Sequence, residues 1–228
     1  MSKEKRTHQD DSFENVESAL SKTEHFIEEN QNKLSIIALA IIVIVAGYWG
    51  MKKFYFMPNE KNAQNDIFYA QQYFEKDSFN LALVGDGQNA GFEDIINEYG
   101  STRAGKLAVF YAGVSNLHLG NYNEAVDYLK SFSTSDEMIA ATAAGALGDA
   151  YSELGQSDDA IAQYKNAASY DNTLTAPTYL MKLGIMYETK GDYKSAIEAY
   201  QKIKDKYAAS AEARQIDKYL TRAELQSK

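Results

Sequence analysis

The sequence contains no cysteine, two prolines, one tryptophan and three histidines among its 228 residues. Without cysteine the chain can form no disulfide, no thiol nucleophile and no thiolate metal site. The histidines, His8, His25 and His118, are too dispersed to give the spacing of a metal-binding pair. Few prolines, seventeen tyrosines and plentiful alanine favour helices. We therefore predict an all-α protein that holds no metal and no cofactor.

Positive charge is scarce, and the formal net charge is −9. Such a chain repels a phosphate backbone, so we expect no nucleic-acid partner. The glycine-rich stretch GDGQNAG (85–91) follows no predicted strand and precedes no Lys-Ser/Thr pair, so it is interpreted as a bent connector rather than a phosphate loop. No nucleophile, base and orienting group can be assembled from the sequence. The prediction is a protein that is not an enzyme and has no small-molecule substrate.

One long apolar run lies near the N-terminus. Residues 34–51 contain no charged side chain, and lysines flank them on both sides, at Lys33, Lys52 and Lys53. A membrane-spanning helix needs about twenty mostly apolar residues. A core helix that is apolar on every face is uncommon in a domain of this size. The run therefore predicts a single membrane span.

The flanks of this run distinguish an anchor from a cleaved signal peptide. A signal peptide begins with a short basic segment and ends in small residues, whereas this run follows a long acidic arm and ends in bulky side chains. The aromatic residues would form a belt at one membrane interface. We predict an uncleaved single-pass anchor over residues 34–57, held by membrane lipid, with its belt at Tyr48, Trp49, Phe54, Tyr55 and Phe56.

Residues 1–33 form a polar arm before the anchor. Apolar residues recur there at helical steps, which predicts an amphipathic helix from about Glu14 with Val16, Leu20, Ile27 and Leu34 on one face. Lysines near the span are divided almost evenly between its two sides, so charge leaves the orientation of the anchor open.

Two segments further along the chain repeat one another at an offset of 36 residues. LGDAYSELGQSDDAIAQYKNAASYD (147–171) aligns with LGIMYETKGDYKSAIEAYQKIKDKY (183–207), and a weaker copy, AGVSNLHLGNYNEAVDYLKSF (112–132), lies 35 residues earlier. The recurring residues are Gly113, Gly120 and Ala125 in the weaker copy, Gly148, Tyr151, Gly155, Ala160 and Tyr164 in the next, and Gly184, Tyr187, Gly191, Ala196 and Tyr200 in the last.

This pattern resembles the tetratricopeptide repeat, in which each unit is a pair of antiparallel helices. The first glycine would permit close approach of the two helices, and the second would take a positive φ that ends the first helix. The alanines would lie at the tightest crossing, and Tyr164 and Tyr200 would fill the gap toward the next unit. The resemblance implies a degenerate first helix pair with a linker over 58–100, three repeats over 101–209 and a capping helix with a tail over 210–228.

The resemblance also implies a partner-binding groove lined by the first helix of each repeat. Its positions fall on Leu107, Phe110, Val114, Leu117, Asp149, Met181, Ile185 and Glu188. Such a groove would be apolar at its first end and acidic further along, with no Lys or Arg among these positions. It would suit an unfolded or apolar segment of a partner protein. The alternative is that Phe110 and Leu117 pack under the degenerate first helix pair.

The order of arm, span and repeats resembles the YfgM family, membrane-anchored tetratricopeptide subunits ancillary to the bacterial Sec translocon, in the form found in Bacteroidota. IINEYGSTRAGKLAVFYAG (95–113) and IKDKYAASAEA (203–213) carry the likeness, although Gly100 and Ala208 stand where that family has proline. The resemblance implies an inner-membrane protein with a cytoplasmic N-terminus and periplasmic repeats. It would associate with SecYEG and with a membrane-anchored chaperone of the PpiD type, and assist the export of secretory or outer-membrane proteins.

The alternative is a cytosol-facing adaptor that tethers a soluble complex to the membrane. Lys52 and Lys53, which directly follow the span, favour it because cytoplasmic flanks are enriched in lysine and arginine.

Overall fold

The computed structural model describes residues 4–228, and their side chains from Leu20 onward with Thr23 excepted. Over these residues the chain is helical and has no strand, so the prediction of an all-α protein is confirmed. The chain divides into two compact units, one ending at Pro58 and the other running from Asn59 to Lys228. Each is described separately below.

The first unit consists of α1 (Glu4–Met51) and a short π-helix, η1 (Lys52–Phe56). The helix begins earlier than the predicted start at Glu14. Leu20, Ile27 and Leu34 are exposed on it, whereas the side chain of Val16 lies outside the described residues.

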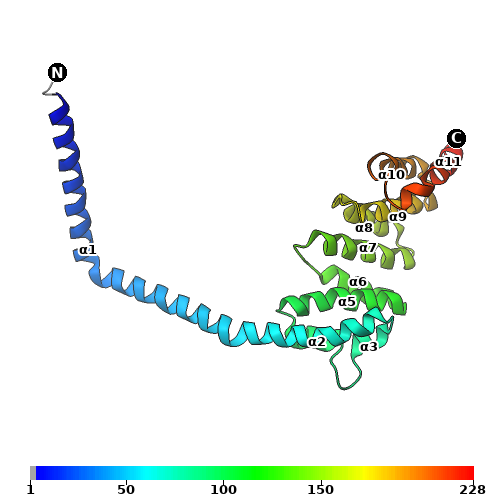
Figure 1. Cartoon of the computed structure of the whole chain (residues 1–228), viewed down its shortest axis with the longest axis horizontal. Helices are drawn as coiled ribbons and strands as arrows, with labels where there is room; N and C mark the ends of the chain where they lie inside the picture. The colour runs from blue at the N-terminus through cyan, green and yellow to red at the C-terminus, as the bar shows by residue number, and fades with distance from the viewer. Residues whose placement is uncertain (1–3) are drawn as a thin grey trace. The chain divides into compact units, whose positions relative to one another are not determined.

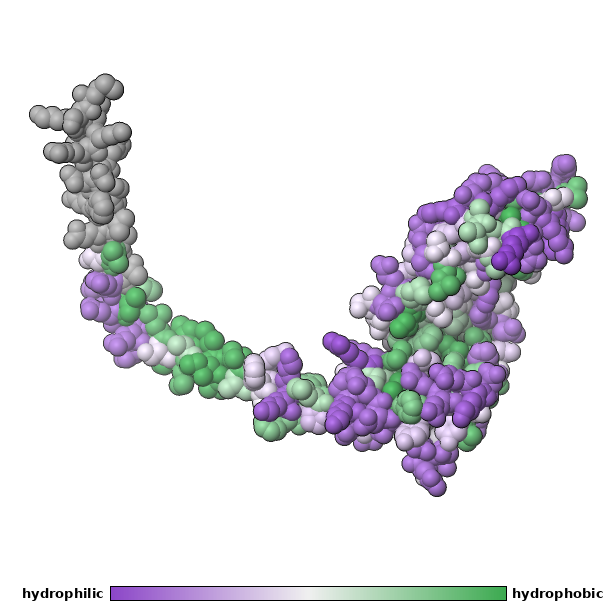
Figure 2. All heavy atoms as spheres, viewed as in Figure 1, coloured by the Kyte–Doolittle hydropathy of each residue, from purple (hydrophilic) through white to green (hydrophobic). Residues whose placement is uncertain are grey.

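The apolar run of α1 is exposed. Its large side chains are each more than half exposed, namely Ile36, Ile37, Leu39, Ile41, Ile42, Val43, Ile44 and Val45. An 18-residue window of this helix has a mean hydropathy of 2.3 and is 0% buried. Figure 2 shows the run as a continuous hydrophobic stretch. By length and composition α1 can cross a membrane, and the prediction of a long apolar N-terminal helix is confirmed.

The second unit begins with three helices, and a hydrogen-bonded loop connects the last two of them. These are α2 (Met57–Glu75), α3 (Phe79–Val84) and α4 (Phe92–Tyr99). Between α3 and α4, Asp86 accepts hydrogen bonds from the Tyr73 hydroxyl at 2.6 Å and from the backbone N–H groups of Gln88 and Asn89 at 2.8 and 2.6 Å. These donors hold the pKa of the Asp86 carboxyl far below its usual range. The glycine-rich stretch is thus a connector closed by its own carboxylate.

Three helix pairs and a terminal helix follow. The pairs are α5 (Arg103–Leu119) with α6 (Tyr122–Ser131), α7 (Glu137–Glu153) with α8 (Ser157–Ser169), and α9 (Ala176–Thr189) with α10 (Tyr193–Lys206). Each helix packs on its neighbours in chain order, and Figure 1 shows the pairs stacked one above another. The result is an α-solenoid. We call the contacts among α5, α6 and α7 the first junction, and those among α7, α8 and α9 the second.

The last helix covers the end of the stack. A 3₁₀ turn, η2 (Glu212–Gln215), leads into α11 (Ile216–Gln226), which packs on α10. Its buried side chains are Ile216, Leu220 and Ala223. We call the contacts among α9, α10 and α11 the third junction. Because α11 buries apolar surface that the last pair would otherwise expose, it has the position of a capping helix.

Candidate partner-binding surface

The first glycine of each repeat lies where the two helices of a pair touch. A Cβ atom built on Gly113 would lie 2.7 Å from Cγ of Leu129, and one on Gly148 would lie 2.7 Å from ring carbons of Tyr164. A Cβ on Gly184 would be closer still to the ring of Tyr200. Real Cβ atoms do not make such contacts. In each pair, the side chain of the second helix therefore occupies the space that a Cβ atom of the first helix would need.

The second glycine of each repeat answers a different requirement. Gly120, Gly155 and Gly191 have φ values of 80°, 72° and 76°, and a Cβ atom on any of them would meet nothing within 4 Å. Glycine is therefore required at these helix ends by the left-handed backbone conformation and not by crowding from neighbouring atoms. At the helix crossings, Ala125, Ala160 and Ala196 are each 0% exposed. Tyr151 and Tyr187 are half-buried against the core.

A charged network joins the second repeat to the third. The Tyr164 hydroxyl on α8 donates to Asp149 of α7 at 2.8 Å, and Lys182 of α9 places its Nζ 2.6 and 2.7 Å from the two Asp149 oxygens. Burial, and then the Asp149 charge, raise the pKa of Tyr164 far above its usual range. The second junction thus contains a tyrosine, a carboxylate and a cation from three helices.

The third junction has the same three kinds of group. Arg222 of α11 places Nη2 2.7 Å from Oε2 of Glu188 on α9. The ring of Tyr200 on α10 is fully buried next to this pair, and its centroid lies 5.5 Å from that of Tyr219. Burial, and then Glu188, raise the pKa of Tyr200 far above its usual range.

The first junction is apolar instead. Leu129 of α6 occupies the position of Tyr164 and Tyr200. Around it lie the half-buried side chains of Phe110, Val114 and Leu117. The ring centroids of Phe110 and Phe132 are 5.5 Å apart. No carboxylate–cation pair joins α5, α6 and α7 among the described residues.

The structure places the predicted groove residues in two groups. In the first group, Leu107, Phe110, Val114 and Leu117 are half-buried and contact the hydrophobic clusters of the stack, so part of each side chain stays exposed. Phe110 and Leu117 pack against a cluster of α6 and α7 residues, whereas Leu107 packs against the cluster that contains the first helices.

The second group of predicted groove residues contains the two acidic positions, Asp149 and Glu188. The charges of Asp149 and Glu188 are paired with Lys182 and Arg222, neither of which stood among the predicted positions. Met181 is buried, whereas Ile185 is 41% exposed. A cavity of about 400 Å³ opens at this end, and Ile185, Glu188 and Arg222 are among its lining residues.

The repeat pattern does not predict one of the packing contacts between repeats. Gly145 faces the ring of Tyr179 on α9, and any Cβ atom there would overlap that ring. Tyr179 is 8% exposed, so this contact joins the second repeat to the third. A glycine three residues before Gly148 was the available signal, because both lie on the face of α7 that meets other helices.

Comparison with known proteins agrees with the helix-pair architecture. Residues 107–135 and 146–211 each match a tetratricopeptide-repeat family. The chain carries tetratricopeptide repeats. The crystal structure of MamA protein, 20% identical, has a TM-score of 0.53 over 72% of this chain and 91% of that one. A second structure of MamA, 23% identical, has a TM-score of 0.42 over 60% and 88%. No curated protein matches the chain.

Tetratricopeptide repeats mediate protein–protein interaction, so the chain is a protein-interaction scaffold. The described residues contain no group of three or more His, Cys, Asp or Glu side chains that could hold a metal ion. The fold alone is shared with the MamA structure, because the identity of the two chains is low.

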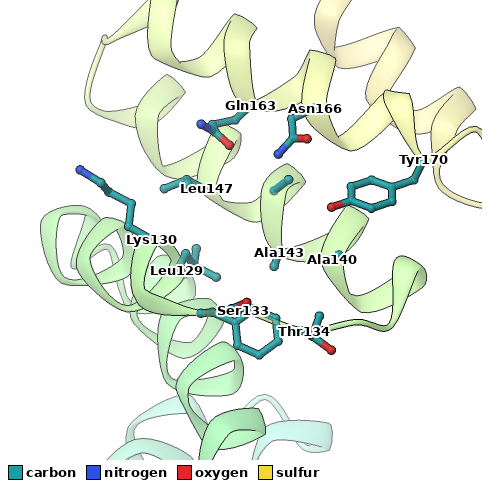
Figure 3. A pocket seen from close by; sticks show the side chains of 12 residues that line it. Leu129, Lys130, Ser133, Thr134, Ala140, Ala143, Leu147, Gln163, Asn166 and Tyr170 are labelled. Atoms are coloured by element: carbon teal, nitrogen blue, oxygen red, sulfur yellow. The ribbon is translucent and has the colours of Figure 1, made fainter.

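Two equivalent cavities lie on another face of the repeats. The first, of about 380 Å³, lies among α6, α7 and α8, and its floor includes Ala143, Ala144 and Leu147. Figure 3 shows Gln163, Asn166 and Tyr170 along one border of this cavity and Ser133 and Thr134 along the opposite border. The second, also of about 380 Å³, lies among α8, α9 and α10. Corresponding lining residues of the two are 35 or 36 positions apart, for example Lys130 and Lys165, and Leu147 and Leu183.

Proposed function

We propose that the chain is a non-enzymatic scaffold that α1 anchors in the bacterial inner membrane, with its N-terminus cytoplasmic and its repeats periplasmic. It acts there as an ancillary component of the Sec translocon and the periplasmic chaperone network. Its partners are SecYEG and a membrane-anchored chaperone of the PpiD type. The observation that carries the proposal is a fully exposed apolar helix on the same chain as partner-binding repeats.

The exposure of α1 supports the anchor. Eight large apolar side chains between Ile36 and Val45 are each more than half exposed, and such a surface is unfavourable in water. Lys33 precedes the run, Lys52 and Lys53 follow it, and Trp49 is 69% exposed next to them. These are the flanks of a helix whose centre lies in hydrocarbon and whose ends lie at the headgroups.

The cavity beside α11 supports the binding of a partner segment. Ile185 offers exposed apolar surface there, and Glu188 and Arg222 border it with a carboxylate and a guanidinium. An apolar side chain of a partner can cover Ile185 while its backbone groups bond to the two charged residues.

The membrane topology is tested by reporters fused after Lys228. Alkaline phosphatase folds to an active enzyme only in the periplasm, whereas green fluorescent protein fluoresces in the cytoplasm. We expect phosphatase activity and no fluorescence. The opposite pattern would favour a cytosol-facing adaptor that tethers a soluble complex, the function to which Lys52 and Lys53 point.

The partners are tested by co-purification of the full chain in a mild detergent. We expect SecYEG and the chaperone to co-purify with the unaltered chain, and Ile185→Glu to reduce their recovery. Leu174→Glu is the matched control, because Leu174 is 69% exposed and lies outside the cavity. Equal recovery with both variants would place the contact elsewhere than this cavity, and absence of SecYEG from every sample would refute the translocon role.

A further inference from the structure

The cavity among α8, α9 and α10 has an apolar floor and a charged rim. Its floor includes Leu180 and Leu183 of α9, which are 3% and 6% exposed. The Tyr187 ring forms part of the wall, and Lys165 of α8 and Lys202 of α10 stand at the rim. We call this the lysine cavity. Its volume of about 380 Å³ has room for one or two peptide side chains.

The two rim lysines are not held in ion pairs within the described residues. Among the described residues, neither Lys165 nor Lys202 forms an ion pair, whereas Lys182, Lys190, Lys204 and Lys206 all do. Lys165 instead holds its Nζ 5.4 Å from the ring centroid of Tyr187, which directs the ammonium group across the wall of the cavity.

The charge of the rim contrasts with the charge of the whole chain. Glu198 also lines the cavity, so two cations stand against one anion in a chain whose net charge is −9. A local excess of positive charge over an apolar floor is complementary to a segment that carries carboxylates and apolar side chains.

The equivalent cavity of the preceding repeat shows that the architecture does not require a lysine at both rim positions. At the offset of 35 residues between the first two repeats, Lys165 corresponds to Lys130, and at the offset of 36 between the last two, Lys202 corresponds to Asn166. Both cavities have about the same volume and an apolar floor. The second cation is therefore particular to the lysine cavity, and the packing of the helices does not require Lys202.

We propose that the lysine cavity binds an acidic peptide segment of a partner protein. An apolar side chain of that segment packs on Leu180 and Leu183, and a neighbouring carboxylate lies between Lys165 and Lys202. This site rests on the scaffold function but differs from the predicted groove. Because 100° separates successive helical residues, Leu180, Leu183 and Tyr187 face away from the side of α9 that carries Ile185 and Glu188.

The experiment uses the full chain in nanodiscs of zwitterionic lipid and three fluorescein-labelled peptides. One alternates leucine with glutamate, one alternates leucine with glutamine, and one alternates serine with glutamate. Fluorescence anisotropy reports binding. We expect the leucine–glutamate peptide to bind best and to lose affinity as salt rises. The double variant Lys165→Gln/Lys202→Gln should bind it about five- to tenfold more weakly.

Two controls isolate the site. Lys130→Gln/Lys204→Gln removes the same charge, one lysine from the other cavity and one from an exposed ion pair, and should leave binding unchanged. Ile185→Glu should also leave peptide binding unchanged, because Ile185 does not line the lysine cavity. Circular dichroism verifies that each variant is folded.

Four outcomes overturn the proposal. Two of them concern the peptides: the leucine–glutamine peptide or the serine–glutamate peptide binds as tightly as the leucine–glutamate peptide. In the third, the Lys165/Lys202 double variant binds the leucine–glutamate peptide with unchanged affinity. In the fourth, the chain binds nanodiscs of anionic lipid in place of the peptide, and this binding depends on the two lysines. The last would reassign the cavity to a lipid surface. The topology reporter and SecYEG co-purification are read separately, so a failure here is distinct from a failure of the translocon role.

Discussion

The first junction of the solenoid and the two that follow are built on the same repeat but join their neighbours differently. Leu129, Phe110 and Phe132 fill the first junction with apolar contacts. In the second and third, a tyrosine takes the place of Leu129, and a carboxylate and a cation accompany it. The repeat pattern fixes how each helix pair closes around its glycine, whereas the contact with the next pair is set by residues outside the pattern.

This difference separates two kinds of stability in one stack. Apolar contacts depend on buried area and tolerate changes of pH and salt. A carboxylate–cation pair depends on protonation and on ionic strength, and it also constrains direction because hydrogen bonds are angular. The following predictions test this contrast, beginning with the largest expected effect.

Gly184→Ala should be the most destabilising single change. The added methyl group would overlap the ring of Tyr200, which is 0% exposed and has no free space to move into. Overpacking of this kind costs about 3 kcal/mol of the free energy of unfolding. Chemical denaturation followed by circular dichroism measures it. Gly47→Ala is the control, because a Cβ atom there meets nothing within 4 Å. Equal effects of the two changes would contradict the packing role of Gly184.

Leu129→Ala should cost about 2–3 kcal/mol, since it leaves a cavity in the first junction. Leu129 is 4% exposed, and Gly113 leaves no nearby side chain that can fill the space. The loss should be the same at low and high salt. Leu174→Ala, at a position 69% exposed, should cost far less. A loss that changes strongly with salt would mean that the first junction also depends on charge.

Lys182→Met should cost about 1 kcal/mol, because the long side chain is kept while its ion pair with Asp149 is lost. The side chains of Lys182 and Asp149 are 37% and 30% exposed, so solvent screens much of their attraction. The loss should shrink as salt rises. Lys204→Met removes a lysine from a more exposed pair and should have almost no effect. If the two variants were equally stable, the second junction would not depend on its charged network.

Lowering the pH should destabilise the later repeats, and this effect should be smaller and more gradual than those of the three substitutions. The pKa of Asp171 is lowered by Lys206 and Tyr207, and that of Asp192 by its hydrogen bonds with Ser195. A lowered pKa in the folded state stabilises the protein above the unfolded value, near 4, and this contribution is lost as pH falls toward the folded value. The midpoint temperature of thermal unfolding should therefore be constant from pH 7 to about 5 and should decrease below about pH 4. Asp171→Asn should make this decrease of the midpoint temperature smaller. If the pH dependence were unchanged in this variant, Asp171 would not contribute to it.

The sequence predicted the parts of this fold that are encoded locally. The spacing of Gly148, Gly155 and Ala160 reflects one helix, its end and the next helix, all within a few turns. The lengths of the pairs and the α-solenoid follow from such spacings, and the fold class was confirmed for that reason. The early start of α1 at Glu4 was not predicted, since the arm has few apolar residues to mark a helical period.

The candidate site was harder to predict because its contacts join different repeats. Asp149 and Lys182 are 33 residues apart, and Glu188 and Arg222 are 34 apart. The two separations are three and two residues shorter than the repeat of 36, so each cation lies within one turn of the position equivalent to its carboxylate. A carboxylate followed by a cation at this separation is a signal that the repeat alignment alone does not contain.

The directional pairs also have a mechanical consequence for the solenoid. A junction held by angular hydrogen bonds resists twisting of one helix pair against the next, whereas Phe110 and Phe132 in the first junction can slide past one another at little cost. We expect the superhelix to be stiff from α7 to α11 and to change its curvature mainly between α5 and α7. A partner that needs a wider or narrower surface would then be accommodated by bending at one place in the stack, with the charged repeats moving as one body.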